Sequence, residues 1–468
     1  MKIRLLVIAM SLSVITGCVR FDLDKSLAQS NEDAGDFTSG NLKLLLNEEQ
    51  RTEAQARAAE LLNTELDQSA AIELAMVNSP AVQAMLAEHW AQSSAIAVSG
   101  SIPNPVFQFS RLSSDSELEI ERLLAIGLLD LIRLPMLSKN ANLQLQGSQL
   151  SLTADTVELV TMVRQAWVNA VATQELSRYA EQVFSSAEAS ATLAAGMQAI
   201  GNFNALSRVR QQSFYADAAT NLTLVRHNAL AAREALIRLL GLNQQQANLL
   251  KLPNRLPDLP DSPVSPEDVA SVSTDTRLDV NLAIGQVQMA TRQQGIKLLS
   301  EVTDVEIAGI RNTVWGEDER ETITGYELEI ELPIFTSIRQ VRNQLNASSL
   351  AATSNLENIT RSAVSHMRES YSAYRSSYDV ATHYRDEVVP LQQLVSEENV
   401  LNYNGMIIGV FELLADSRAQ IETVQSSIEA AAQFWMADAA LRATIVGKPT
   451  TTMMAMSGGG DSGGGEEH

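Results

Sequence analysis

Cysteine and histidine, which build most metal and nucleophilic sites, are scarce in this chain. Cys18 is the only cysteine among 468 residues, so no internal disulfide can form even in an oxidising compartment. No histidine lies in a His-Glu-x-x-His, paired-cysteine or nucleophile-elbow pattern, and no glycine-rich phosphate loop is present. We therefore expect no enzyme, no cofactor and no metal site. The histidines are His89, His227, His366, His383 and His468.

Basic and aromatic residues are also few. The chain has 34 Lys and Arg against 56 Asp and Glu, and this charge of −22 excludes nucleic acid as a partner, because phosphate binding needs a basic surface. Aromatic residues make up 5% of the chain, and five of the 12 prolines fall between Pro253 and Pro266. The remaining composition is suited to long helices, and the length allows two or three domains.

The N-terminus has the pattern of a bacterial export signal. Lys2 and Arg4 precede an apolar run from Leu5 to Ile15 that is too short to span a bilayer. Ile15-Thr16-Gly17-Cys18 resembles a lipobox, so we predict a lipoprotein signal peptide over residues 1–17 and lipid attachment, with palmitate, at Cys18. Val19, in place of Asp, favours the outer membrane. The alternative is an ordinary signal peptide that contains a cysteine by chance. After Cys18 no stretch is long and apolar enough for a transmembrane helix.

The chain contains one pattern, G-x-F-x-x-L-x-x-x-R, twice. It begins at Gly201 and again at Gly409, each time between two helical patterns, as expected for the turn of a helical hairpin. Leu134-Pro135 likewise recurs as Leu332-Pro333. We interpret these recurrences as an internal duplication; the alternative is chance similarity between helical segments.

Periodicity predicts the same order of elements in each half. Each repeat is expected to hold a helix, a β-hairpin (about 103–134 and about 303–335) and a long helical hairpin, with tips near 200–206 and 403–414. We expect an irregular segment at 31–36, a helix over about 266–299, and a kink at Pro390 in a long helix over 336–402. The predicted organisation is an N-terminal anchor segment at 18–66, a first repeat at 67–250, a proline-rich linker at 251–265, a second repeat at 266–447 and a disordered tail at 448–468.

The strand patterns are those of a membrane barrel. Tyr326, Leu328, Ile330 and Leu332 alternate with Glu327, Glu329 and Glu331, which puts an apolar face against a carboxylate face. From Leu123 to Leu134 the alternation is lost, so the register there is undefined. Four strands are too few to close a barrel around a lumen, so several copies must share one barrel.

The whole arrangement resembles the TolC-type outer-membrane efflux family, and its lipoprotein branch in particular. The resemblance is carried, besides the lipobox and the two tips, by Ala75 to Pro80, Pro103-Asn104-Pro105, Ala232 to Leu242 and Gly325 to Phe335. It implies a mainly α fold in which long helical hairpins form a trimeric helical barrel, and four strands per protomer contribute to a shared 12-stranded β-barrel.

The resemblance also implies a function. Such proteins are passive exit ducts of tripartite efflux pumps or type I secretion systems, lipid-anchored and barrel-inserted in the bacterial outer membrane and extending into the periplasm. The implied partners are a homotrimer, a periplasmic adaptor (membrane fusion) protein, an inner-membrane transporter of the RND or ABC type, and outer-membrane lipid. A non-conducting periplasmic lipoprotein scaffold of helical hairpins is the alternative. The substrate stays open among drugs, metal ions, metabolites and polypeptides, and Met453-Met454-Ala455-Met456 could bind soft metals or be incidental.

The tips are the expected docking sites for the adaptor, through Gly201, Asn202, Phe203, Asn204, Gly405, Gly409 and Phe411. The glycines are expected to permit turn conformations and the phenylalanines to pack the turns. Glu412 is either part of an acidic selectivity ring or a solvated carboxylate at a helix N-terminus. The second tip departs from the family pattern Tyr-x-x-Gly, because Gly405 follows Tyr403 one residue early and Met406 occupies the expected glycine position.

Overall fold

The computed structural model describes residues 19–38, 42–115, 117–271, 277–300, 305–315, 320–332, 334–335 and 337–449. The chain divides into two compact units. The first, here called the strand unit, comprises Met1–Asp33, Ala84–Asp155 and Thr274–Ala363, and the second, the tip unit, comprises Ala34–Gln83, Thr156–Ser273 and Val364–His468. Each unit therefore takes segments from both repeats.

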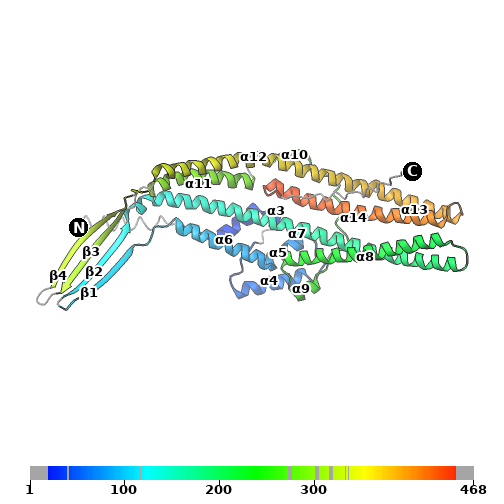
Figure 1. Ribbon diagram of the computed structural model, residues 1–468, viewed down its shortest axis with the longest axis horizontal. Helices are drawn as coiled ribbons and strands as arrows, with labels where there is room; N and C mark the ends of the chain where they lie inside the picture. Colours follow the sequence, from blue (N-terminus) through cyan, green and yellow to red (C-terminus); the bar gives the residue numbers. More distant parts are fainter. Residues whose placement is uncertain are drawn as a thin grey trace. The chain divides into compact units, whose positions relative to one another are not determined.

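The strand unit contains one antiparallel sheet of four strands in the order β1-β2-β3-β4 (Figure 1). The β2–β3 ladder joins the two repeats, since Leu118 is opposite Trp315 and Gly127 is opposite Glu306. All three ladders are regular, and the alternation in the sequence matches this register everywhere except at the end of β2, from Leu123 on. The strands are β1 (Val106–Ser113), β2 (Leu118–Gly127), β3 (Val305–Trp315) and β4 (Arg320–Ile330).

The helices of the strand unit are held partly by a buried polar network. Ser26 on α2 contacts His89 on α6 (Oγ to Nε2, 3.1 Å), and Ser148 on α7 contacts the other ring nitrogen at 3.2 Å. Gln149 on α7 donates to the backbone oxygen of Ser26 at 2.9 Å and to the hydroxyl of Ser30 at 2.6 Å. Helices lying wholly or partly in this unit are α2 (Leu23–Asp33), α6 (Pro80–Ser99), α7 (Leu128–Ala199), α11 (Leu278–Ser300) and α12 (Ile338–His383).

The tip unit contains two helical hairpins, α7 with α8 and α13 with α14, side by side in each pair (Figure 1). Leu240 and Gly241 at the end of α8 accept hydrogen bonds from the side chain of Asn78 at 3.1 and 3.0 Å. Gly241 has φ 65°, and a Cβ there would lie 2.7 Å from the Cα of Ser79, so only glycine fits this joint. The other elements of the unit are α3 (Gly35–Thr38), α4 (Glu48–Leu61), α5 (Gln68–Asn78), α8 (Ala205–Leu240), α9 (Gln244–Leu249), α10 (Pro266–Ser271), η3 (Tyr384–Val388), α13 (Val389–Asn404) and α14 (Val410–Val446).

The proline-rich segment 251–265 has no regular structure, as predicted, and aromatic side chains hold it in place. The hydroxyl of Tyr374 accepts from the backbone nitrogen of Val264 at 3.0 Å, and that of Tyr378 donates to the oxygen of Pro260 at 3.1 Å. The rings of Tyr374 and Tyr378 pack against buried Phe434 on α14. The linker is therefore part of the packed structure.

Several element boundaries differ from the predictions. The segment 31–36, expected to be irregular, continues α2 to Asp33 and begins α3 at Gly35, because Gln149 and His89 fix the buried side of α2. The helix expected over 266–299 consists of two helices, α10 and α11.

The poorly alternating run 123–134 divides at Gly127, where β2 ends, and Leu128 begins α7, which continues for 72 residues with Pro135 inside it. The long helix predicted over 336–402 is interrupted by a π-helical turn, η3, which ends two residues before Pro390. Proline lacks a backbone N–H and displaces the carbonyl four residues earlier, which accounts for the widened turn. Among the described helices, none alone is long and apolar enough to cross a membrane, although the bent pair α5 and α6 satisfies this criterion when taken together.

Candidate pore wall and helical tips

The charged residues of the four strands are separated by sign between the two faces of the sheet. Residues opposite each other across a ladder share a face, so the registers assign every strand residue to one face. All six strand glutamates lie on one face, which we call the acidic face, and all four strand arginines lie on the other. The glutamates are Glu119, Glu121, Glu306, Glu321, Glu327 and Glu329.

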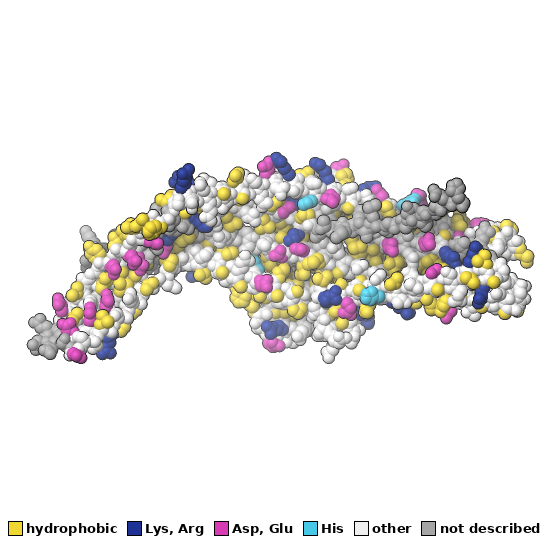
Figure 2. All heavy atoms as spheres, in the orientation of Figure 1, with side chains coloured by type: hydrophobic (Ala, Val, Ile, Leu, Met, Phe, Trp, Pro, Cys, Tyr) yellow, Lys and Arg dark blue, Asp and Glu magenta, His cyan; other side chains and the backbone are white. Residues whose placement is uncertain are grey.

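The acidic face is hollow. A depression of about 320 Å³ crosses all four strands and is lined only by residues of this face, including Gln108, Glu121, Glu306 and Glu327. Glu306 is directly opposite Glu329, and the side chain of Asn312 donates a hydrogen bond to Glu119. Acidic side chains gather over the strands on the face turned toward the viewer in Figure 2. The alternation predicted for Glu327 and Glu329 is confirmed.

The opposite face, which we call the apolar face, exposes large hydrophobic side chains. Tyr326, which follows Gly325 on β4, is 85% exposed. A row of such side chains in water is unfavourable, and one large apolar face opposite a polar one is typical of a barrel strand in lipid. The acidic face exposes Val106, Leu112 and Ile323, whereas the apolar face exposes Phe107, Phe109, Leu124, Ile307, Tyr326, Leu328 and Ile330.

The sheet has two open edges. Within the described residues, β1 and β4 each pair on one side only. β4 is the outer strand in Figure 1 and is exposed along its whole length. An exposed edge of this length is a template for pairing with another strand.

The first tip is a glycine turn followed by a capped helix. Gly201 has φ 81°, the left-handed conformation that ends α7. The side-chain oxygen of Asn204 accepts from the backbone nitrogen and from the hydroxyl of Ser207, each at 2.8 Å, and so caps α8. Asn202 and Asn204 are exposed and Phe203 is half-buried, so the structure brings the four predicted residues of this tip together.

The second tip differs from the prediction in one respect. Gly405 and Gly409 have φ of −79° and −86°, so neither adopts a conformation that requires glycine. The residue with positive φ is Met406, at 57°, and its side chain is 93% exposed. This is the position at which the family pattern Tyr-x-x-Gly has its glycine. Phe411 and Glu412 belong to the first turn of α14, and their side chains lie outside the described part of the chain.

The structure adds one residue that the sequence did not identify as a site. Asp416 on α14 is buried, and its Oδ1 accepts from the side-chain nitrogen of Gln392 on α13 at 2.9 Å. Its Oδ2 is also buried and has no partner. Arg418, two residues after Asp416, places its guanidinium carbon 4.3 Å from the centre of the Phe214 ring. In the sequence, Asp416 lies within the second copy of the repeated pattern, between Gly409 and Arg418.

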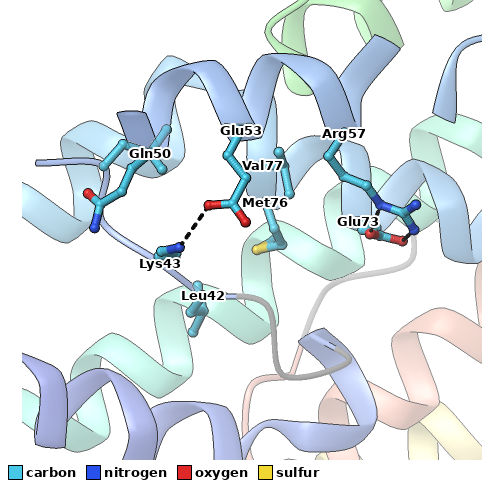
Figure 3. Close-up of a pocket in the computed structure, with 10 residues that line it drawn as sticks. Leu42, Lys43, Gln50, Glu53, Arg57, Glu73, Met76 and Val77 are labelled. Atoms are coloured by element: carbon cyan, nitrogen blue, oxygen red, sulfur yellow. Dashed lines mark hydrogen bonds and ion pairs between the residues drawn. The ribbon is translucent and has the colours of Figure 1, made fainter. Parts of the chain in front are cut away.

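A separate hollow of about 310 Å³ lies between α4 and α5 (Figure 3). Lys43 faces Glu53 at 3.4 Å, and Arg57 holds Glu73 at 2.7 Å and Glu60 at 2.7 Å. The hydrogen bonds that Arg57 donates to Glu73 and Glu60 raise the pKa of Arg57 above its ordinary value. The charges of this hollow thus neutralise one another. Cys18 and residues 450–468 of the tail lie outside the described chain.

Comparison with protein-family models and with curated proteins finds no match. Solved structures do match. The outer membrane protein VceC from Vibrio cholerae superposes with a TM-score of 0.64 at 13% identity, covering 85% of this chain and 98% of that one. The MtrE outer membrane channel of Neisseria gonorrhoeae superposes with a TM-score of 0.65 at 15% identity, covering 85% of this chain and 91% of that one.

The CmeC outer membrane channel of Campylobacter jejuni gives a TM-score of 0.65 at 12% identity, covering 84% of this chain and 86% of that one. All three similarities extend over most of both chains. The expectation of long helical hairpins with four strands per protomer is confirmed. The chain has the fold of the TolC-type outer-membrane channels.

Proposed function

We propose that three copies of this chain form an exit duct in the bacterial outer membrane. The observation that carries the proposal is the four-stranded sheet, with its hollow acidic face, its apolar face and its two open edges. If β4 of one protomer pairs with β1 of the next, three protomers close a 12-stranded barrel, and no edge remains unpaired. The apolar face then contacts lipid and the acidic face lines a water-filled lumen.

Conduction through this duct is passive. The glutamates on the acidic face, repeated in three protomers, concentrate cations in the lumen by their summed field. Energy comes from an inner-membrane transporter of the RND or ABC type. We assign the chain to a tripartite efflux pump or a type I secretion system, in which the duct itself carries out no chemistry.

The helical tips are the proposed docking sites for a periplasmic adaptor. Both turns expose apolar side chains with few local contacts: Ile200 and Leu206 at the first, and Met406 and Ile407 at the second. Asn202 and Asn204 at the first tip and Gly405, Gly409 and Phe411 at the second complete the surface. Glu412, at the start of α14, is the proposed acidic group of the entrance.

Lipid attachment at Cys18 completes the proposal. Val19 lies against Gly100, where a Cβ would come within 2.9 Å of the valine side chain. Gly100 ends α6 six residues before β1 begins at Val106. Val19, the residue after Cys18, thus lies at the end of α6 from which the chain continues into β1, which supports anchoring in the same membrane.

Planar-bilayer conductance of the detergent-extracted oligomer tests the proposal, with its mass measured in parallel. A trimer with cation-selective channels is expected. A protein that is released from the membrane once Cys18 is replaced by Ser, and that never conducts, would instead be a scaffold. Charge reversal with Asn202→Glu should reduce cross-linking to the adaptor and leave the trimer intact.

A further inference from the structure

The four strand arginines form a band on the apolar face, which the proposed barrel leaves in contact with lipid. The registers place Arg122 on β2 directly opposite Arg311 on β3. We call residues of one face that are opposite one another across the strands a row. Arg111 on β1 lies one row nearer the hairpin turns than Arg122 and Arg311, and Arg320 on β4 lies two rows nearer. No carboxylate shares this face within the four strands, because all six glutamates point the other way.

The facing pair Arg122 and Arg311 is unfavourable in isolation. Side chains directly opposite in an antiparallel ladder have Cβ atoms about 5 Å apart, and like charges at that distance destabilise the sheet. Within the described residues, neither guanidinium group forms an ion pair with a carboxylate. Arginines facing lipid are also costly unless they reach a polar layer. An anion bridging the two side chains would remove both penalties.

The band lies at the outer end of the apolar surface. Toward the helices, the rows contain Phe107, Leu124 and Tyr326, then Ile126, Ile307 and Leu328. The apolar surface continues beyond β4 to Leu332, Ile334 and Phe335, the last of them 99% exposed. Toward the hairpin ends, the next row holds Thr313 and Thr322 beside Ile120, and Trp315 lies beneath the guanidinium of Arg320 at 5.4 Å. An aromatic residue beside arginine is typical of a membrane–water interface.

The proposed insertion fixes which interface this is. β1 follows α6 and β2 leads into α7, so the helices join one end of the sheet and the hairpin turns form the other. With the helices in the periplasm, the arginine band lies in the outer leaflet. The headgroup there must be anionic and able to span neighbouring guanidinium groups; phosphate has these properties, and the planar guanidinium group binds it in a bidentate manner.

We propose that Arg122 and Arg311, with Arg111 and Arg320 beside them, bind the phosphate groups of a phosphorylated glycolipid of the outer leaflet. The lipid's acyl chains pack on the apolar rows that contain Phe107, Leu124 and Tyr326, and its phosphates neutralise the facing arginines. The site thus specifies both the depth of the sheet in the membrane and the leaflet it contacts. This inference rests on the proposed barrel.

Native mass spectrometry of the purified full-length oligomer tests the inference, with bisphosphorylated lipid A and its phosphate-free form as the two probes. Wild-type protein should retain the bisphosphorylated form at least about tenfold more than the phosphate-free form, because charge-assisted hydrogen bonds are lost without phosphate. R122Q/R311Q should lose this preference, and R122K/R311K should keep part of it. E327Q, on the acidic face, is the matched control and should bind as wild type does.

Three results would overturn the inference. One is equal retention of the two lipids by wild-type protein, a comparison that needs no variant and so holds even if R122Q/R311Q does not assemble. Another is an unchanged preference in R122Q/R311Q. A third is loss of the lipid on adding millimolar inorganic phosphate, which would mean that the arginines bind free phosphate in place of a lipid headgroup. Conductance of the same samples separates this inference from the proposed function: a conducting oligomer with no lipid preference overturns only the lipid site, and a non-conducting monomer overturns the barrel.

Discussion

The backbone nitrogen of Met406 donates to the oxygen of Tyr403 at 3.0 Å and closes the second tip as a turn. Met406 adopts φ 57° in this turn, and the left-handed conformation costs an L-residue about 1 kcal/mol. The second tip therefore holds methionine in a left-handed conformation that glycine usually adopts. The glycine one position earlier, Gly405, does not relieve it, because its φ is −79°.

Met406→Gly should stabilise the second tip by about 0.5 kcal/mol. The substitution removes the backbone strain, and this gain is slightly larger than the free-energy cost of the greater conformational entropy that glycine gives the unfolded chain. Gly201→Ala, at φ 81°, should destabilise the first tip by about 1 kcal/mol. Gly409→Ala is the control: its φ is −86° and a Cβ would meet nothing within 4 Å. Hydrogen exchange at the turn amides measures all three, and greater exchange in Met406→Gly would contradict the assignment of strain.

The buried contact between Gln392 and Asp416 should join α13 to α14. Asp416→Ala leaves the Gln392 amide without its acceptor and should cost about 1–2 kcal/mol, seen as faster hydrogen exchange along 389–404. Asp416→Asn keeps an acceptor oxygen and should cost less. In a double-mutant cycle, Gln392→Leu should add little to Asp416→Ala. Full additivity of the two substitutions would show that the hydrogen bond contributes nothing.

The stability of the strand unit should decrease as the pH falls below about 6.5. Burial lowers the pKa of His89, so the folded state binds fewer protons than the unfolded state below the ordinary histidine pKa. Because the two states differ by at most one bound proton, the free energy of unfolding falls by at most about 1.4 kcal/mol for each unit that the pH is lowered. Protonation would also force both ring nitrogens to donate to Ser26 and Ser148.

His89→Gln should remove this pH dependence, measured by denaturant unfolding between about pH 5.5 and 7.5, where ordinary carboxyl groups remain ionised. Glu88 and Asp155 line the hollow beside His89 and are the carboxyl groups nearest to it in that hollow. His383→Gln is the matched control, because His383 is exposed. An identical pH profile in His89→Gln would assign the effect to another group.

The acidic face should set the ionic preference of the channel. E306Q/E329Q removes two carboxylates that face each other across the β3–β4 ladder, and the reversal potential under a salt gradient should shift toward zero. Because like charges no longer oppose each other, the sheet should become slightly more stable. R122Q/R311Q, on the apolar face, is the control and should leave the reversal potential unchanged. The same shift in both variants would argue against a lumen lined by the glutamates.

The parts of the fold that could be predicted from sequence are those that repeat with a short period. The alternation from Tyr326 to Glu331 predicts both faces of β4, and the absence of proline after Met136 predicts one long helix. Residues 31–36 could not be predicted, because the contacts that order α2 come from His89 and Gln149, far along the chain. The positive φ of Met406 could not be predicted either, because a left-handed turn is expected at glycine.

Within the candidate site, the glutamates of β4 could be predicted, whereas the arginine band could not. Arg122 and Arg311 belong to different repeats, and only the β2–β3 register shows that they face each other. In the sequence Arg122 precedes the run Leu123 to Leu134, where alternation fails because a strand ends and a helix begins.

The interleaving of the two repeats determines the order in which the chain can be assembled. The β2–β3 ladder pairs Leu118 with Trp315, so it closes a very long loop and forms late. Until β3 (Val305–Trp315) is available, β2 is paired with β1 only and its other edge is open. That waiting strand edge is open to wrong partners, including the first hairpin of another copy.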